Sequence, residues 1–188
     1  MRAGRKPSVY RLLALALVAA LSAIPCASAQ ERDLEDAVKA TFLMRFASFV
    51  QWPAESFPDP AQPVAVCLVG DAAFARLVES AARGERVGRR EIAVRHFETL
   101  PPDAGCHLLF VAGAPSGSGA AALQAVHGQP VLTVTDARRG RLRGMIHFVL
   151  DDGRVRFHID RDAAEAASLN VSSRLLSVAA SVRSRRPS

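Results

Sequence analysis

The sequence lacks the residue patterns that most often carry enzyme chemistry. It has no serine in a GxSxG turn, no HExxH motif and no paired-cysteine spacing of the kind that holds zinc. Its segment GAPSGSGA, residues 113–120, has neither the lysine of a P-loop nor the third glycine of a dinucleotide fingerprint. We find no internal repeat and no long low-complexity linker. We therefore expect a protein that is not an enzyme, with no catalytic residue, no cofactor and no metal ion.

The N-terminal apolar run is too short for a permanent membrane span, which needs about 20 residues. Residues 12–24 are rich in leucine and alanine, follow four basic residues and precede the small-residue site Ala27-Ser28-Ala29. This order is typical of a secretory signal peptide. We predict that residues 1–29 are removed, that the mature chain is exported to the periplasm, and that residues 30–188 form one domain with a basic C-terminal tail.

The excess of positive charge is small once this leader is removed. The whole chain has 24 basic and 18 acidic residues, a net charge of +6, but four basic residues lie in the leader, which leaves +2. Proteins that bind nucleic acid usually present a clustered basic face. The remaining cluster of Arg183, Arg185 and Arg186 lies in the tail, where we expect a solvated end. Nucleic acid is therefore not an expected partner.

Cysteine is scarce, and the leader removes one of the three. Cys67 and Cys106 remain in an oxidising compartment, where disulfides form and persist. A bond between them closes a loop of roughly 39 residues and stabilises the fold by about 4 kcal/mol in the chain-entropy model. The alternative is two buried free thiols on separate strands.

Two apolar runs predict the centre of an α/β sheet. Residues 63–70, PVAVCLVG, read as a strand buried on both faces, and residues 106–113 form a second such run. Such strands need helices packed above and below them, so we predict a three-layer α/β sandwich with a mostly parallel central sheet. The other expected elements are helices over 71–83, 119–127, 161–169 and 172–184 and strands over 91–97 and 130–136. Residues 137–144 are expected to form a basic, mobile connection.

The mature chain opens with an apolar helix that ends at Trp52-Pro53. Leu34, Val38, Phe42, Phe46 and Phe49 recur at helical spacing, and Leu43, Ala47 and Val50 widen the stripe. These aromatics either belong to the core or form a groove for a partner protein, and base rates favour the core. If a partner surface exists, the sequence predicts it around Arg45, Phe46, Phe49 and Trp52.

Residues 144–160 show the pattern of a β-hairpin. Two alternating runs flank Asp152-Gly153, a favoured two-residue turn. The register pairs Leu150 with Val155, Phe148 with Phe157 and Ile146 with Ile159 on one face. On the other face it places Asp151 opposite Arg154, Val149 opposite Arg156, and His147 opposite His158. The two histidines are close enough to share a metal, but without a third ligand we expect two solvated side chains. His96, His107 and His127 appear isolated in the sequence.

The segments KATFLMRFASFVQWP, VCLVGD, CHLLFV, VLTVTD, GMIHFVLDDGRVRFHID and SSRLLSVAASV, in this order, resemble the YfiR-like family of periplasmic proteins. The similarity covers about residues 34–182. It implies a compact α/β sandwich that forms a homodimer. It also implies a repressor that binds the periplasmic domain of an inner-membrane diguanylate cyclase and so controls cyclic-di-GMP, biofilm and motility. Relief by redox or envelope stress, and by an outer-membrane lipoprotein that sequesters the repressor, is implied as well.

This sequence departs from the family at two places. Cys67 and Cys106 match the main family disulfide, but the second cysteine pair of some members is absent. Ile159-Asp160-Arg161 stands where an Ile-Asn-Leu type stretch is common. The alternative function is a periplasmic small-ligand binder that serves a sensor kinase or receptor. Its crevice would use the strand ends at Gly70-Asp71 and the loop from Gly113 to Gly119.

Overall fold

The computed structural model describes residues 25–112 and 117–184. The chain divides into two compact units, residues 1–35 and 36–188, and the second unit is a single α/β domain. Of the predicted leader, residues 1–24 lie outside the described residues, and residues 25–29 belong to the start of helix α2 (Pro25–Ser48). Among the described residues, no helix has the length and apolar character that crossing a membrane requires.

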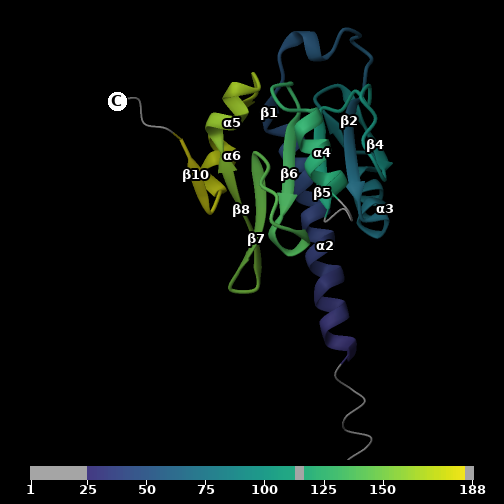
Figure 1. Cartoon of the computed structure of the whole chain (residues 1–188), viewed down its shortest axis with the longest axis vertical. Coiled ribbons are helices and arrows are strands. Elements are labelled where there is room, and N and C mark those ends of the chain that lie inside the picture. The colour runs from purple at the N-terminus through teal and green to yellow at the C-terminus, as the bar shows by residue number, and fades with distance from the viewer. Residues whose placement is uncertain (1–24, 113–116, 185–188) are drawn as a thin grey trace, which may run out of the picture. The chain divides into compact units, whose positions relative to one another are not determined.

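An eight-stranded sheet forms the centre of the described domain (Figure 1). Its strand order is β10-β8-β7-β6-β5-β2-β4-β3, and the pairs from β4 through β7 are parallel. The predicted mostly parallel sheet is therefore confirmed. The strands are β2 (Val64–Gly70), β3 (Arg86–Val87), β4 (Arg90–Phe97), β5 (Leu108–Ala112), β6 (Leu132–Asp136), β7 (Ile146–Asp151), β8 (Arg154–Asp160) and β10 (Ser181–Arg183).

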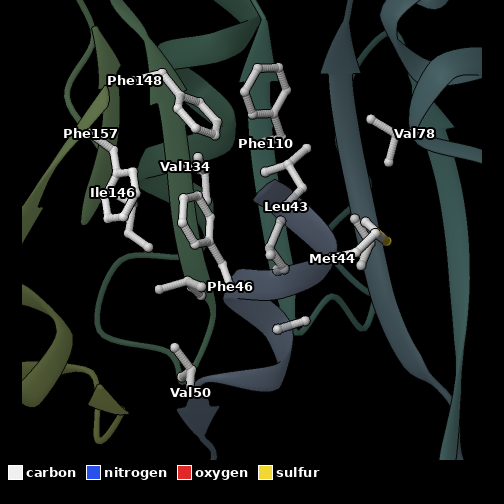
Figure 2. Close-up of a cluster of buried hydrophobic side chains, with 14 of the residues drawn as sticks. Leu43, Met44, Phe46, Val50, Val78, Phe110, Val134, Ile146, Phe148 and Phe157 are labelled. Carbon is white, nitrogen blue, oxygen red and sulfur yellow. The ribbon is translucent and has the colours of Figure 1, made fainter. Parts of the chain in front are cut away.

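Helices cover both faces of the sheet, because its inner strands are apolar on both sides. On one face, α2 and α3 (Ala72–Ala82) pack against β2, β5 and β6, and Figure 2 shows Phe46 among Val134, Ile146 and Phe148. On the other face, α4 (Ser118–Ala125) packs against Cys67, Val69 and their neighbours. The remaining short elements are β1 (Val50–Gln51), β9 (Asn170–Val171), α5 (Arg161–Ala166), α6 (Ser173–Val178) and the 3-10 turns η1 (Ala54–Ser56) and η3 (Ala137–Arg139).

Helix α2 ends earlier than the apolar spacing predicts. It stops at Ser48, and Val50 and Gln51 form strand β1, which pairs with β9. The predicted stripe is also wrong at its start, because Leu34 is 67% exposed and Val38 is 37% exposed. The centre of the stripe is right, since Leu43, Phe46 and Ala47 are fully buried.

The hairpin has the predicted register at all six residue pairs, including His147 opposite His158. Asp152 and Gly153 both have positive φ, as a two-residue turn of this type requires. The last predicted helix is partly wrong. Helix α6 is capped by Ser172 but ends at Val178, well before the predicted end at residue 184, and residues 181–183 form strand β10 alongside β8.

Candidate functional site

Cys67 and Cys106 form the predicted disulfide. Cys67 lies in the middle of β2 and Cys106 stands just before β5, with the two Cα atoms 5.7 Å apart. Cys67 is fully buried and Cys106 is partly exposed. The bond therefore ties two neighbouring parallel strands together beneath α4 and closes a loop that contains α3 and β4.

His107, next to Cys106, holds the chain around the amino ends of β2 and β5. Its Nδ1 atom accepts a hydrogen bond from the amide of Ala65 at 3.0 Å, and its Nε2 atom lies 2.9 Å from the carbonyl oxygen of Ser56. A carbonyl only accepts, so Nε2 carries the proton and the ring is neutral. Burial, together with the charges of Arg90 and Arg95, lowers the pKa of His107, although the bond to Ser56 opposes this shift.

Aromatic and cationic side chains surround His107. Phe57 stacks on its ring with centroids 4.2 Å apart, and the guanidinium of Arg90 lies 4.1 Å from the centroid of Phe57. Trp52 donates from Nε1 to the carbonyl oxygen of His107 at 3.1 Å. We call Trp52, Phe57, Arg90, Cys106 and His107 the amino-edge cluster. We predicted from the sequence that His107 is isolated. Its hydrogen-bond partners escaped that prediction because they lie between 42 and 55 residues away in the chain.

The structure separates the four residues of the predicted partner surface. Phe46 is fully buried and packs against Phe148 and Phe157, so it cannot contact a partner. Arg45 is exposed, Phe49 is half-buried, and Trp52 is held in the amino-edge cluster. A partner surface at Arg45, Phe49 and Trp52 stays a prediction.

The cross-strand histidines are not the solvated pair that we expected. His147 is 3% exposed, and its Nδ1 atom lies 2.8 Å from the hydroxyl of Thr135. Burial comes first among the causes that lower the pKa of His147 to about 4, and the Arg143 charge comes second. His158 contacts Ser181 through its own Nδ1 atom at 2.6 Å. Within the described part of the chain, no group of three His, Cys, Asp or Glu residues could hold a metal ion.

Charged side chains meet at the carboxyl ends of β2 and β6. Lys39 Nζ and Asp136 Oδ2 form a buried ion pair at 2.6 Å. Arg139 bonds to Asp36 at 2.6 Å and to Asp71, its Nε atom lies 3.4 Å from Asp136, and its guanidinium lies over the ring of Phe74. We call Asp36, Lys39, Asp71, Asp136 and Arg139 the carboxyl-edge cluster.

This cluster corrects the prediction that residues 137–144 form a mobile connection. Arg139 is anchored by carboxylates from three separate elements, so the start of the connection is fixed to the sheet. Burial raises the pKa of Asp71, but bonds from the Phe74 amide and from Arg139 outweigh it and leave that pKa below its usual value.

The carboxyl-edge cluster includes Asp71, which we predicted to line the ligand crevice if the protein were a small-ligand binder. Asp71 accepts the amides of Ala73 and Phe74 as the N-cap of α3 and also binds Arg139. Its carboxylate is therefore fully engaged in local structure. Residues 113–116 of the predicted crevice lie outside the described residues.

Comparison with models of protein families gives a match to this chain. A family model described as YfiR/HmsC-like matches residues 36–180, which is nearly all of the second compact unit. No curated protein matches the chain significantly.

Proposed function

Because the chain belongs to the YfiR/HmsC-like family, we propose that it is an exported, non-catalytic regulator that binds the periplasmic domain of an inner-membrane diguanylate cyclase and inhibits it. The observation that carries this proposal is the family match over residues 36–180. Cyclic-di-GMP would be the output of the partner, so biofilm formation and motility would respond. A homodimer, and an outer-membrane lipoprotein that sequesters the protein, belong to the same proposal.

Inhibition of this kind is a matter of differential binding. A regulator without chemistry of its own shifts its partner only by as much as its affinities for the active and inactive states differ. Moving the cyclase from almost fully active to almost fully inactive needs about 5.5 kcal/mol of that difference. A rigid binding surface favours this, because less conformational entropy is lost on association. The disulfide and the amino-edge cluster supply rigidity beside Trp52.

We place the contact surface at Arg45, Phe49 and Trp52. Arg45 is the exposed cation on α2 nearest to the two half-buried aromatics in sequence. Aromatic and arginine side chains dominate the binding energy of many protein interfaces. Phe46, which the sequence also suggested, is excluded from this surface by its burial.

A cell-based measurement tests the proposal. Deleting the gene for this chain should raise cyclic-di-GMP in a strain that carries its inner-membrane cyclase, and restoring the exported chain should lower it again. Complementation with Arg45→Glu should fail, whereas Arg156→Glu, an exposed arginine on β8, should complement fully. Equal cyclic-di-GMP levels with and without the chain would contradict the proposal.

A further inference from the structure

A pocket of about 290 Å³ opens between the C-terminal end of α4 and helix α5. Its walls are mainly apolar, with Leu123 and Val126 from one side, Ala163 and Ala167 from the other, and Met145 between them. It lies toward the amino end of β6, away from the crevice at Gly70-Asp71 that the sequence suggested. Small-molecule sites in proteins are commonly of this kind, apolar with a few polar groups that fix orientation.

One charged group on the pocket wall has no partner of opposite charge. Arg143 is exposed, and within residues 25–112 and 117–184 no carboxylate pairs with it. The acidic residue on the wall, Asp160, is already engaged. Its carboxylate accepts the amide of Ala163 at 3.1 Å and pairs with Arg183 at 2.9 Å. The pocket therefore offers an available cation beside an apolar surface.

The segment that carries Arg143 is fixed on the sheet. The amide of Gly144 donates to the hydroxyl of Thr135 at 2.9 Å, and the amide of Met145 donates to that of Thr133 at 3.0 Å. A Cβ atom at Gly144 would lie 2.8 Å from the carbonyl oxygen of Thr133, so only glycine allows this close approach. The backbone of Arg143 is thus held at the pocket rim rather than on a free loop.

The Arg143 charge also acts on its surroundings. After burial, it is the largest cause that lowers the pKa of the neighbouring His147, where His158 and Lys39 act in the same direction and Asp136 opposes them. The Arg143 charge therefore acts at His147 as well as at the pocket wall, and a cation beside an apolar surface favours a negatively charged ligand over a neutral or cationic one.

We propose that this pocket binds a small carboxylate with an apolar body, the carboxylate on the guanidinium of Arg143 and the body against Leu123, Val126 and the α5 alanines. The guanidinium forms bidentate bonds to carboxylates, which fixes the orientation of such a ligand. This site goes beyond the regulatory role, and it stands or falls independently of that role because its test needs only the purified chain.

Three small molecules separate the contribution of the ligand's charge to binding from that of its apolar body. Hexanoate should raise the melting temperature of the exported chain in a concentration-dependent way, since a ligand that binds only the folded state stabilises it. Hexanol has the apolar body without the charge, and inorganic phosphate has the charge without the apolar body. Both should bind at least about tenfold more weakly than hexanoate in calorimetric titration, as loss of a charged hydrogen bond or of the apolar contact predicts. Equal binding of either one, or no binding of hexanoate, would overturn the proposal.

Paired variants locate the site. Arg143→Gln should weaken hexanoate binding about tenfold or more, and Ala163→Leu should abolish it by filling the pocket. The matched controls are Arg141→Gln, an exposed arginine two residues away, and Ala121→Leu, an exposed alanine on α4 outside the pocket wall. Both controls should bind like the parent. Circular dichroism confirms that each variant is folded, and a folded Arg143→Gln protein with unchanged affinity would refute the assignment.

Discussion

The two ends of the parallel sheet are held by different kinds of interaction. At the amino edge, a disulfide, a neutral histidine and stacked aromatic rings hold the chain. At the carboxyl edge, two cations and three carboxylates do so, and the pair of Lys39 with Asp136 is completely buried. The amino-edge cluster has a covalent cross-link and no ion pair between its members, whereas the carboxyl-edge cluster has ion pairs and no covalent cross-link.

This difference predicts which conditions each end responds to. Reductant and mild acid act on a disulfide and on a histidine that is held neutral, so they should loosen the amino edge first. The carboxyl-edge cluster contains neither a disulfide nor a histidine, and it depends on charge balance, because a buried charge that loses its partner is costly. The contact surface that we propose near Trp52 would therefore lie beside the end of the sheet that responds to reductant and mild acid.

The largest effect should come from breaking the charge balance at the carboxyl edge. Asp136→Leu removes the carboxylate that pairs with buried Lys39 and should lower the free energy of unfolding by about 3–5 kcal/mol. The double variant Lys39→Met with Asp136→Leu should recover most of that loss, because neither charge is then buried. Urea denaturation measures both. Asp151→Leu, at an exposed carboxylate, should change stability by less than about 0.5 kcal/mol. A loss in Asp136→Leu no larger than in this control would show that the ion pair is not important.

Opening the disulfide should have the next largest effect. Replacing both Cys67 and Cys106 by serine should remove up to about 4 kcal/mol for a loop of this length and lower the melting temperature by roughly 10 °C. Reductant should have the same effect on the parent and none on the double variant. The single tryptophan, Trp52, donates a hydrogen bond to the carbonyl oxygen of His107, which follows Cys106 in the chain. Its fluorescence should therefore change when the disulfide is opened. Identical melting of oxidised and reduced protein would contradict this prediction.

The sequence predictions were right for features that neighbouring residues determine and wrong for features that depend on residues far away in the chain. The hairpin register was right at every pair because the turn residues and the alternation lie within one segment. The disulfide was right because the predicted leader contains the third cysteine, Cys26, which left Cys67 and Cys106 as the expected pair. The burial of Lys39 was missed because its partner lies 97 residues away, and the end of α2 was missed because β1 depends on β9. Distant pairing of this kind leaves no periodic signal in the sequence.

The last effect is the response to mild acid, which is spread over several pH units and which we assign to the histidines. The folded state lowers the pKa of His107 and of His147, while the unfolded chain takes up protons below about pH 6.5. Their contribution to stability is therefore complete above pH 6.5 and is lost as the pH falls toward the folded-state pKa values. Each proton adds a slope of at most about 1.4 kcal/mol per pH unit.

Substitution of His107 measures how much of this pH dependence of stability comes from the amino edge. His107→Asn keeps an acceptor for the Ala65 amide but cannot titrate, so the loss of stability between pH 6.5 and pH 4.5 should become shallower. His127→Asn, at an exposed histidine, should leave the slope unchanged. Asp71 should contribute almost nothing in this window, because its pKa lies below its usual value of 3.8. Equal slopes in the parent and in His107→Asn would reject the role of His107.

Direct binding to the cyclase tests the central claim most closely. The purified, oxidised chain is titrated calorimetrically against the isolated periplasmic domain of the inner-membrane diguanylate cyclase from the same organism. We predict saturable binding that Arg45→Glu weakens at least tenfold and that Arg156→Glu leaves unchanged. Absence of binding by a folded, oxidised chain to a folded cyclase domain would contradict the account.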